Sequence, residues 1–184
     1  WAQVHTLVES VASMDSKDCE SMNSCFEDEP WFIDADGVCL CHRPRLYWTS
    51  WELLEGEGVA IGYGSDGRLP IQGEVVLSAD KDPGDYLEPG WSLMKGRSLP
   101  TFTTSRPSNT PLKRPAGLKS CEEHERERWR TDLHRFPPYQ YRDENCLRSS
   151  KGELRIPNVN EREVIMGFPL NYTSQCLPKR DHGT

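Results

Sequence analysis

The sequence lacks any hydrophobic run close to the roughly 20 residues that a membrane-spanning helix needs, and it shows no signal peptide. These absences predict a protein that is neither membrane-embedded nor secreted. Hydrophobic residues are also scarce, at 35% of the 184 residues, whereas 28% are charged. Six Trp and six Tyr nevertheless argue against a disordered chain, which would be poor in aromatic residues. We therefore expect a modest ordered body that carries long loops.

Acidic residues are missing from one long segment, residues 89–121, although the formal net charge of the whole chain is −7. A local basic block is suited to contacts with phosphate groups. The segment therefore predicts binding to nucleic acid, and a solvated linker is the alternative interpretation. Its six cations are Lys95, Arg97, Arg106, Lys113, Arg114 and Lys119.

The seven Cys form an odd set, which favours free thiols in a reducing compartment. Cys39 and Cys41 lie beside His42, but zinc sites usually space their ligands as Cys-x-x-Cys or wider, with a second pair further along. We therefore predict ordinary thiols near a strand end, and no metal site.

The first fifty residues alternate between apolar segments and a helix-compatible one. Residues 4–12 predict a short buried strand, residues 14–26 a helix capped by Asp15 or Ser16, and residues 31–35 and 45–51 two further strands. This order favours the edge of a mostly parallel α/β sheet.

A glycine-rich run, residues 62–67, fits the pattern Gly-x-Gly-x-x-Gly. A dinucleotide loop must lead from a strand into a helix, whereas Pro70 follows here and suits a strand edge. We therefore predict a hairpin that pairs residues 58–64 with residues 71–77, and we reject a nucleotide site.

Two helices are predicted in the last third of the chain. Residues 120–133 are densely charged and helix-compatible, and Pro137 with Pro138 would end that helix. Asn158 and Glu161 have the spacing of a capping box at the start of a second helix.

One carboxyl group stands inside an apolar segment, at Glu9 between Val8 and Val11. An unpaired charge is costly in a low dielectric, so this carboxyl must be paired, exposed or functional. Arg43 and Arg45 are candidate partners. A structural ion pair and a ligand site at the strand ends both fit these residues.

Four short segments resemble, in their order along the chain, motifs of the DNA cytosine-5 methyltransferases. Each segment is a weak signal alone, but four in the correct order with sensible spacing make a specific pattern. The animal de novo methyltransferases look like the nearest relatives. The segments are residues 7–14, residues 31–35 with 42–48, residues 99–104, and residues 155–169.

The resemblance implies an α/β fold, in which the edge of a Rossmann-like methyltransferase sheet precedes an irregular, loop-rich target-recognition segment. Residues 1–51 would form the last strands of the catalytic sheet. Residues 52–154 would form the recognition segment, and residues 155–184 a closing helix and a truncated tail.

The resemblance also implies roles for single residues. Glu9 would hold or protonate a flipped cytosine at N3, while Arg45, assisted by Arg43, would contact the cytosine O2. The residues with an implied structural role are Arg155, Asn158, Glu161, Gly167 and Phe168. The implied DNA contacts are Arg97, Thr103, Thr104, Arg106, Lys113, Arg114 and Lys119.

The chain departs from the family pattern at two positions, where Ser10 replaces an Asn and Cys41 replaces a Gln. The Pro-Cys nucleophile, a cofactor loop and the family's final Gly-Asn segment are missing from the sequence. With the start at Trp1, these absences lead us to expect the second half of a catalytic domain, inactive by itself. S-adenosylmethionine would then bind only the intact enzyme, at a site outside this chain.

DNA is the expected partner, and the missing half could belong to a longer protein or to a complementary chain. The expected location is the nucleus in a eukaryote and the cytoplasm otherwise. Two alternatives stay open: a non-catalytic DNA-binding or regulatory remnant, and an unrelated small binding protein. The lack of a parallel sheet edge within residues 4–51 would favour the second of these.

Overall fold

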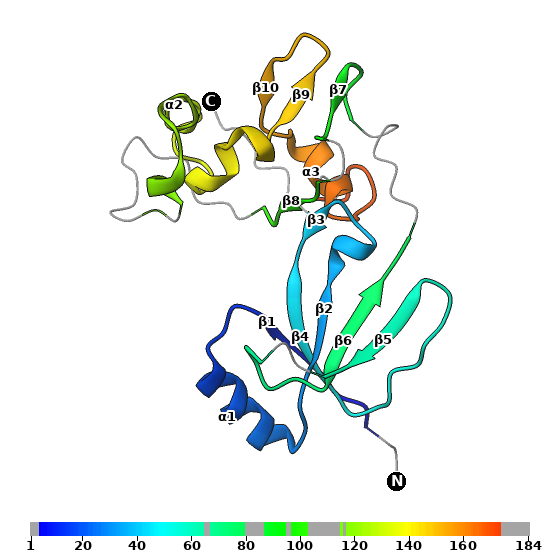
Figure 1. Cartoon of the computed structure of the whole chain (residues 1–184). Helices are drawn as coiled ribbons and strands as arrows, with labels where there is room; N and C mark the ends of the chain where they lie inside the picture. Colours follow the sequence, from blue (N-terminus) through cyan, green and yellow to red (C-terminus); the bar gives the residue numbers. More distant parts are fainter. Residues whose placement is uncertain are drawn as a thin grey trace, which may run out of the picture. The chain divides into compact units, whose positions relative to one another are not determined.

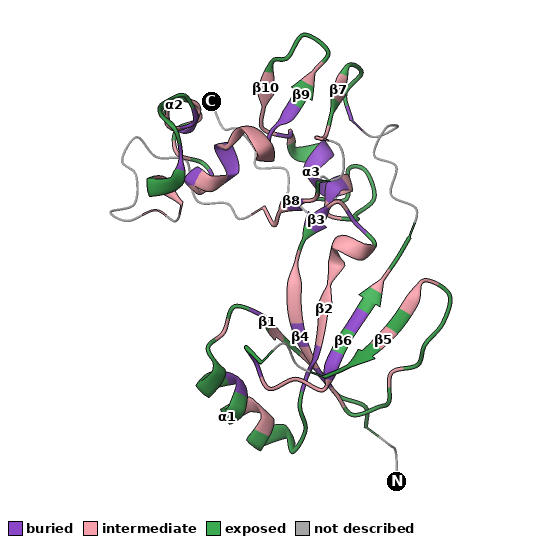
Figure 2. Cartoon of the chain, in the orientation of Figure 1, coloured by how far each residue is buried: buried purple, intermediate pink, exposed green. Residues whose placement is uncertain are grey.

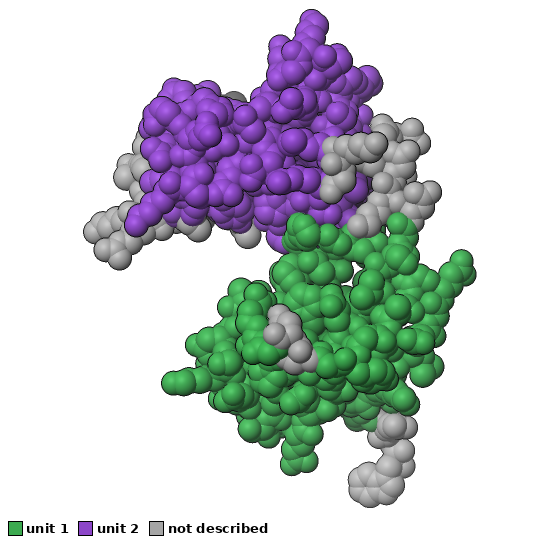
Figure 3. Space-filling view, viewed as in Figure 1, with its two compact units in different colours: residues 1–38, 42–80 green, residues 39–41, 81–184 purple. Residues whose placement is uncertain are grey.

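The computed structural model describes residues 4–64, 67–79, 87–94, 97–102, 115 and 117–173. The chain divides into two compact units, which Figure 3 distinguishes by colour. Unit 1 comprises residues 1–38 and 42–80, and unit 2 comprises residues 39–41 and 81–184. Each unit has a hydrophobic cluster of its own.

Unit 1 is built on an open, mixed five-stranded sheet (Figure 1). Its spatial order is β1-β4-β2-β6-β5, and within this sheet only the pairing of the described strands β2 and β6 is parallel. The prediction of a mostly parallel sheet edge is therefore wrong. The strands are β1 (Leu7–Val11), β2 (Trp31–Asp34), β4 (Pro44–Thr49), β5 (Val59–Tyr63) and β6 (Gly73–Leu77).

Connection length explains the antiparallel pairing of β2 with β4. Only residues 35–43 join the two strands, and they include the short helix η1 (Ala35–Gly37) and β3 (Cys41–His42). A parallel crossover needs about a dozen residues or more. β1 and β2 do run in the same direction, because each pairs antiparallel with β4, which lies between them.

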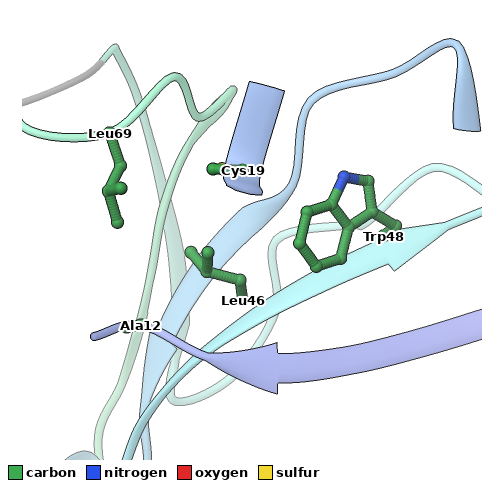
Figure 4. Packing of buried hydrophobic residues seen from close by; sticks show 5 residues of the cluster. All are labelled: Ala12, Cys19, Leu46, Trp48 and Leu69. Carbon is green, nitrogen blue, oxygen red and sulfur yellow. The ribbon is translucent and has the colours of Figure 1, made fainter. Parts of the chain in front are cut away.

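Helix α1 (Ser16–Phe26) covers one face of this sheet and forms as predicted. The Asp15 side chain caps it by accepting a hydrogen bond from the Asp18 backbone N–H at 2.9 Å. The core beneath α1 is a small cluster, shown in Figure 4. It contains Ala12, Cys19, Leu46, Trp48 and Leu69.

Strand β1 is shorter and more exposed than the buried strand predicted over residues 4–12. Leu7 and Val11 are 56% and 47% exposed, and they alternate with residues that face the α1 cluster. The physical reason is position, because β1 lies at an edge of the sheet and pairs only with β4 among the described strands.

The predicted hairpin is present, with β5 and β6 paired from Val59–Leu77 to Tyr63–Gly73. Gly62 therefore lies inside a strand and not in a strand-to-helix turn. Both strands belong to the same sheet as β1 and β4, although they fall within residues 52–154.

Unit 2 holds short elements around a cluster of Trp129, Phe136 and Tyr141. Its sheet has the order β10-β9-β7, and β8 (Leu99–Pro100) pairs with β3. Figure 2 shows the burial of each element; α3 is largely buried. The remaining elements are β7 (Trp91–Ser92), η2 (Leu118–Ser120), α2 (Glu123–Thr131), η3 (Pro138–Tyr141), η4 (Asp143–Asn145), β9 (Leu147–Ser149), β10 (Leu154–Arg155) and α3 (Val159–Ile165).

Helix α2 forms within the predicted range but ends at Thr131, well before Pro137. Leu133 and His134, with φ of 52° and 56°, turn the chain away before the prolines are reached. The prediction that Pro137 and Pro138 end the helix is therefore wrong, and Pro138 instead begins η3. None of the described helices is long and apolar enough to cross a membrane.

Candidate functional site

Glu9 and Arg45 lie on neighbouring strands. β1 and β4 are antiparallel, with Glu9 opposite Tyr47 and Val11 opposite Arg45. Residues that face each other across a ladder, and residues two apart along a strand, share one face of the sheet. Glu9, Arg45 and Tyr47 therefore project from the face opposite to the one that packs on the α1 cluster.

Two arginines converge on one oxygen of Glu9. Arg45 Nε donates a hydrogen bond to Glu9 Oε1 at 2.9 Å, and Arg43 Nη2 lies 3.7 Å from the same oxygen. Arg45 Nη1 donates to the Pro44 carbonyl at 2.9 Å. Glu9 Oε2 and Arg45 Nη2 have no hydrogen-bond partner among the described residues. One acceptor atom of Glu9 and one donor atom of Arg45 are thus left without a partner in the described part of the chain.

The cluster is open to solvent. The Glu9 and Arg43 side chains are each 41% exposed, and that of Arg45 is 18% exposed. Apolar neighbours therefore do not seal this ion pair. The structure contains cavities of about 650 Å³ in unit 1 and about 630 Å³ in unit 2, but neither is lined by Glu9 or Arg45. Glu9 and Arg45 therefore stand outside both cavities.

Asp34, at the end of β2, forms hydrogen bonds with the backbone of the residues that lead into β4. Its Oδ1 accepts hydrogen bonds from the backbone N–H groups of Arg43, at 2.7 Å, and Asp36, at 3.1 Å. His42 Nδ1 lies 3.3 Å from Asp34 and 3.1 Å from Asp36. Sequence reasoning missed Asp34, although an Asp that ends a strand before Asp-Gly is a signal for such a side-chain turn.

Tyr47 is a second residue near the pair that sequence reasoning missed. It stands opposite Glu9 in the ladder and two positions from Arg45. Burial raises the pKa of Tyr47 and the Glu9 carboxylate adds to the rise, while Arg43 and Arg45 oppose it. The phenol therefore stays neutral and available as a hydrogen-bonding group. The strict alternation of strand side chains was the signal for it.

In unit 2, Arg155 binds Glu161 through two parallel hydrogen bonds. Arg155 Nη1 donates to Glu161 Oε2 and Nη2 donates to Oε1, both at 2.7 Å. Arg155 Nη2 also reaches Glu88 at 3.1 Å, and its guanidinium lies 4.3 Å from the centre of the Trp91 ring. These contacts join residues 88–91 to the start of α3.

The predicted capping box of α3 is present. The Glu161 N–H donates to Asn158 Oδ1 at 3.0 Å, and the Asn158 N–H donates to Glu161 Oε2 at 2.8 Å. Burial opposes ionisation of Glu161, but the hydrogen bonds from Arg155 and from the backbone outweigh it, and the pKa is lowered.

The other two residues with an implied structural role, Gly167 and Phe168, follow the end of α3. Gly167 has φ of 83°, which favours glycine, and a Cβ there would lie 3.3 Å from Cys39 Cβ. The Phe168 ring stacks on Tyr172 with a centroid distance of 5.0 Å.

Of the predicted DNA contacts, the structure describes two. Arg97 forms an ion pair with Glu144 at 3.8 Å, and Lys119 is an exposed residue of η2. Thr103, Thr104, Arg106, Lys113 and Arg114 lie outside the described residues.

Two groups of residues have side chains that metals use. Cys39 and Cys41 are buried, with their sulfur atoms 3.6 Å apart, while His42 faces Asp34 and Asp36. A second group consists of His124, Glu125 and Asp143, whose ligand atoms lie within 4.8 Å of one another.

The second group is engaged in other bonds. Glu125 accepts hydrogen bonds from the backbone N–H groups of Glu122 and Asp143, and Arg128 binds the Asp143 carboxylate. The carboxylates thus cap a helix and balance an arginine.

Comparisons with known proteins identify no family: no protein-family model matches the chain, and no curated protein matches it. A functional assignment therefore rests on the residues of the chain and on their geometry.

Proposed function

We propose that this chain is the second half of the catalytic domain of a DNA (cytosine-5) methyltransferase, in which Glu9, Arg43 and Arg45 bind a flipped cytosine. The observation that carries the proposal is the contact between Arg45 Nε and Glu9 Oε1, which joins residues 36 positions apart. The order of the four sequence segments supports it.

The open atoms of the pair match one edge of cytosine. N3 and O2 are adjacent atoms of the ring, so the groups that serve them must also be adjacent. Arg45 Nη2 would donate to O2, and the Glu9 carboxyl, in its protonated form, would donate a hydrogen bond from Oε2 to N3, which is an acceptor atom. Both interactions draw electron density from the ring, so a thiolate adds more readily at C6 and C5 becomes nucleophilic.

In this proposal, the Cys thiolate that attacks C6 and the methyl donor are not supplied by this chain. S-adenosylmethionine supplies the methyl group to the intact enzyme, but the residues present here do not fit it. Gly62 lies in a strand of the β5–β6 hairpin, whereas a cofactor loop leads from a strand into a helix. We expect calorimetric titration of the chain with S-adenosylmethionine to show no heat of binding. Micromolar binding would contradict this assignment.

The proposal is tested with short DNA duplexes that carry one cytosine opposite an abasic site, from which the base leaves the stack easily. The same duplex with thymine is the reference. We expect about tenfold tighter binding to the cytosine duplex, within the range of about 1–3 kcal/mol for a two-point base contact. Glu9→Gln and Arg45→Met should remove the preference.

Glu74→Gln is the matched control, because Glu74 is an exposed glutamate of the same sheet on the α1 face. It should keep the preference for cytosine. Binding to both duplexes with equal affinity would instead support a non-catalytic DNA-binding remnant. No binding to either would support an unrelated small binding protein, which the antiparallel pairings within residues 4–51 favour. As a DNA-modifying protein, the chain would act in the nucleus of a eukaryote and in the cytoplasm otherwise.

A further inference from the structure

Unit 2 contains a cavity of about 630 Å³ between α2, β10 and the first turn of α3. This volume lies within the range of roughly 300–1,000 Å³ that is usual for small-molecule sites. Its apolar wall is formed by Phe136, Leu154, Ile156 and Pro157. Its charged lining consists of Glu127, Arg128, Asp132, Arg135, Arg155 and Arg162.

Three of the four arginines in the lining have a carboxylate close by. Arg128 binds Asp143, and Arg155 binds Glu161 and Glu88. Arg135 Nε lies 3.6 Å from Asp132. These three cations therefore have their charges balanced within the protein.

Arg162 differs from them. It is only 9% exposed, and no carboxylate of the described residues forms an ion pair with it. Its Nε donates to the Asn158 carbonyl at 3.2 Å, and its guanidinium lies 4.4 Å from the centre of the Phe136 ring. The Arg162 guanidinium also lies 5.8 Å from the centre of a second ring, that of Phe102. Aromatic rings attract a cation but do not neutralise it.

Arg162 has two further donor groups, Nη1 and Nη2, besides Nε. The residue lines the cavity, and Nη1 and Nη2 have no hydrogen-bond acceptor among the described residues. Burial lowers the pKa of Arg162 and the charge of Arg135 lowers it further, while Asp132, Tyr141 and Glu161 partly oppose this fall. A buried cation beside an apolar wall is suited to an anion that carries an apolar body.

We propose that this cavity binds an organic anion, with its carboxylate or phosphate on Arg162 and its apolar body against Phe136 and Ile156. The proposal is independent of the methyltransferase assignment, because none of these residues belongs to the Glu9 cluster. Phosphate and carboxylate share the planar, two-oxygen contact that a guanidinium makes, so the structure favours both head groups.

Four probes separate the contributions of charge and apolar body. Phenyl phosphate and phenylacetate carry both, inorganic phosphate carries charge alone, and benzyl alcohol carries the ring alone. Binding is followed by NMR, through the Arg162 Nε–H signal and the Ile156 methyl signals. We expect at least one ring-bearing anion to bind at least tenfold more tightly than inorganic phosphate and benzyl alcohol. Comparison of the two ring-bearing anions identifies the head group.

Arg162→Met keeps a long side chain against the rings and removes the charge. It should abolish the preference for the anions over benzyl alcohol. Arg148→Met is the control, since Arg148 is an exposed arginine of β9 outside the cavity, and it should change nothing. Equal affinity for benzyl alcohol and the anions, or an equal loss in both variants, would overturn the proposal.

A second measurement needs no variant. Ring protons of the bound anion should show nuclear Overhauser effects to the Ile156 methyl groups in the unsubstituted chain. The absence of these effects at saturating probe would show that the anion binds elsewhere, and a failure of all four probes to bind would equally refute the site.

Discussion

Glu9 Oε1 on β1 lies 2.9 Å from Arg45 Nε on β4, and the contact is partly open to water. Ion pairs between exposed side chains add little stability, because water screens the charges and both side chains lose freedom. The pair is therefore expected to contribute little to the stability of unit 1.

We predict a weak energetic coupling between these two residues. In a double-mutant cycle of Glu9→Gln and Arg45→Met, the coupling should be about 0.5–1 kcal/mol, as is usual for exposed pairs. Urea unfolding measures it. If breaking the pair costs about 3–5 kcal/mol, as for a buried ion pair, the contact is structural.

The pair of Arg155 and Glu161 should behave in the opposite way. Glu161 is fully buried and accepts hydrogen bonds from Arg155, Glu88 and Asn158. Glu161→Gln leaves Arg155 without its main counter-charge, and we expect a loss of about 3 kcal/mol in the free energy of unfolding. Glu153→Gln, at an exposed position before β10, should cost less than about 0.5 kcal/mol.

The lowered pKa of Glu161 predicts that the stability of the chain depends on pH. Because the folded pKa of Glu161 is lowered, the unfolded chain binds its proton more tightly than the folded chain does. The stabilisation is thus present above the ordinary Glu pKa and is lost as the pH falls through the lower, folded value. Urea unfolding between pH 6 and pH 3 should show a shallower fall in stability for Glu161→Gln than for the unsubstituted chain. Equal slopes would contradict the prediction.

Local signals in the sequence predicted the local structure. Asp15 before α1 and the spacing of Asn158 and Glu161 before α3 gave correct helix starts, because caps depend on residues within one turn. The glycine-rich run followed by Pro70 likewise predicted the hairpin of residues 58–64 with residues 71–77. Each of these features is decided by neighbours in the chain.

Features that depend on distant residues could not be predicted in this way. Strand β4 lies between β1 and β2, so both of these strands pair antiparallel with β4 and not parallel with each other. The residues of β4 alone do not indicate which strands it will pair with. The early end of α2 accompanies the packing of Phe136 and Tyr141 with Trp129, a cluster that joins residues on both sides of the turn at Leu133 and His134. The burial of Arg162 is equally non-local, since Phe102 and Phe136 come from other parts of the sequence.

The pairing of β5 with β6 predicts that a side chain at Gly73 lowers the stability of the chain strongly. A Cβ there would lie 2.0 Å from the Gly62 carbonyl oxygen and 2.9 Å from Tyr63 Cα, which are backbone atoms that cannot rotate away. We expect Gly73→Ala to destabilise the chain by about 1–3 kcal/mol or more in urea unfolding. Gly56→Ala is the control, because a Cβ there meets nothing within 4 Å, and it should be close to neutral. Similar stability of the two variants would refute this pairing.

The basic block of residues 89–121 should contribute phosphate contacts to DNA binding. Replacing Lys113 and Arg114 by Gln removes two cations from a segment without acidic residues. We expect weaker binding to duplex DNA of any sequence, because phosphate contacts carry no base specificity. The plot of log affinity against log salt should flatten by about 1.8, since each phosphate contact contributes a slope of about 0.9. Fluorescence anisotropy over a series of salt concentrations measures both quantities.

Arg148→Gln with Lys151→Gln is the matched control for this prediction. It removes the same number of charges from exposed positions of the same unit, outside the basic block. General electrostatic attraction would flatten the salt dependence equally in both double variants, because it depends on net charge alone. Contacts made by the basic block would flatten it only in the Lys113 and Arg114 variant. An unchanged slope in that variant would identify the block as a solvated linker, and DNA contacts would then have to be sought elsewhere on the chain.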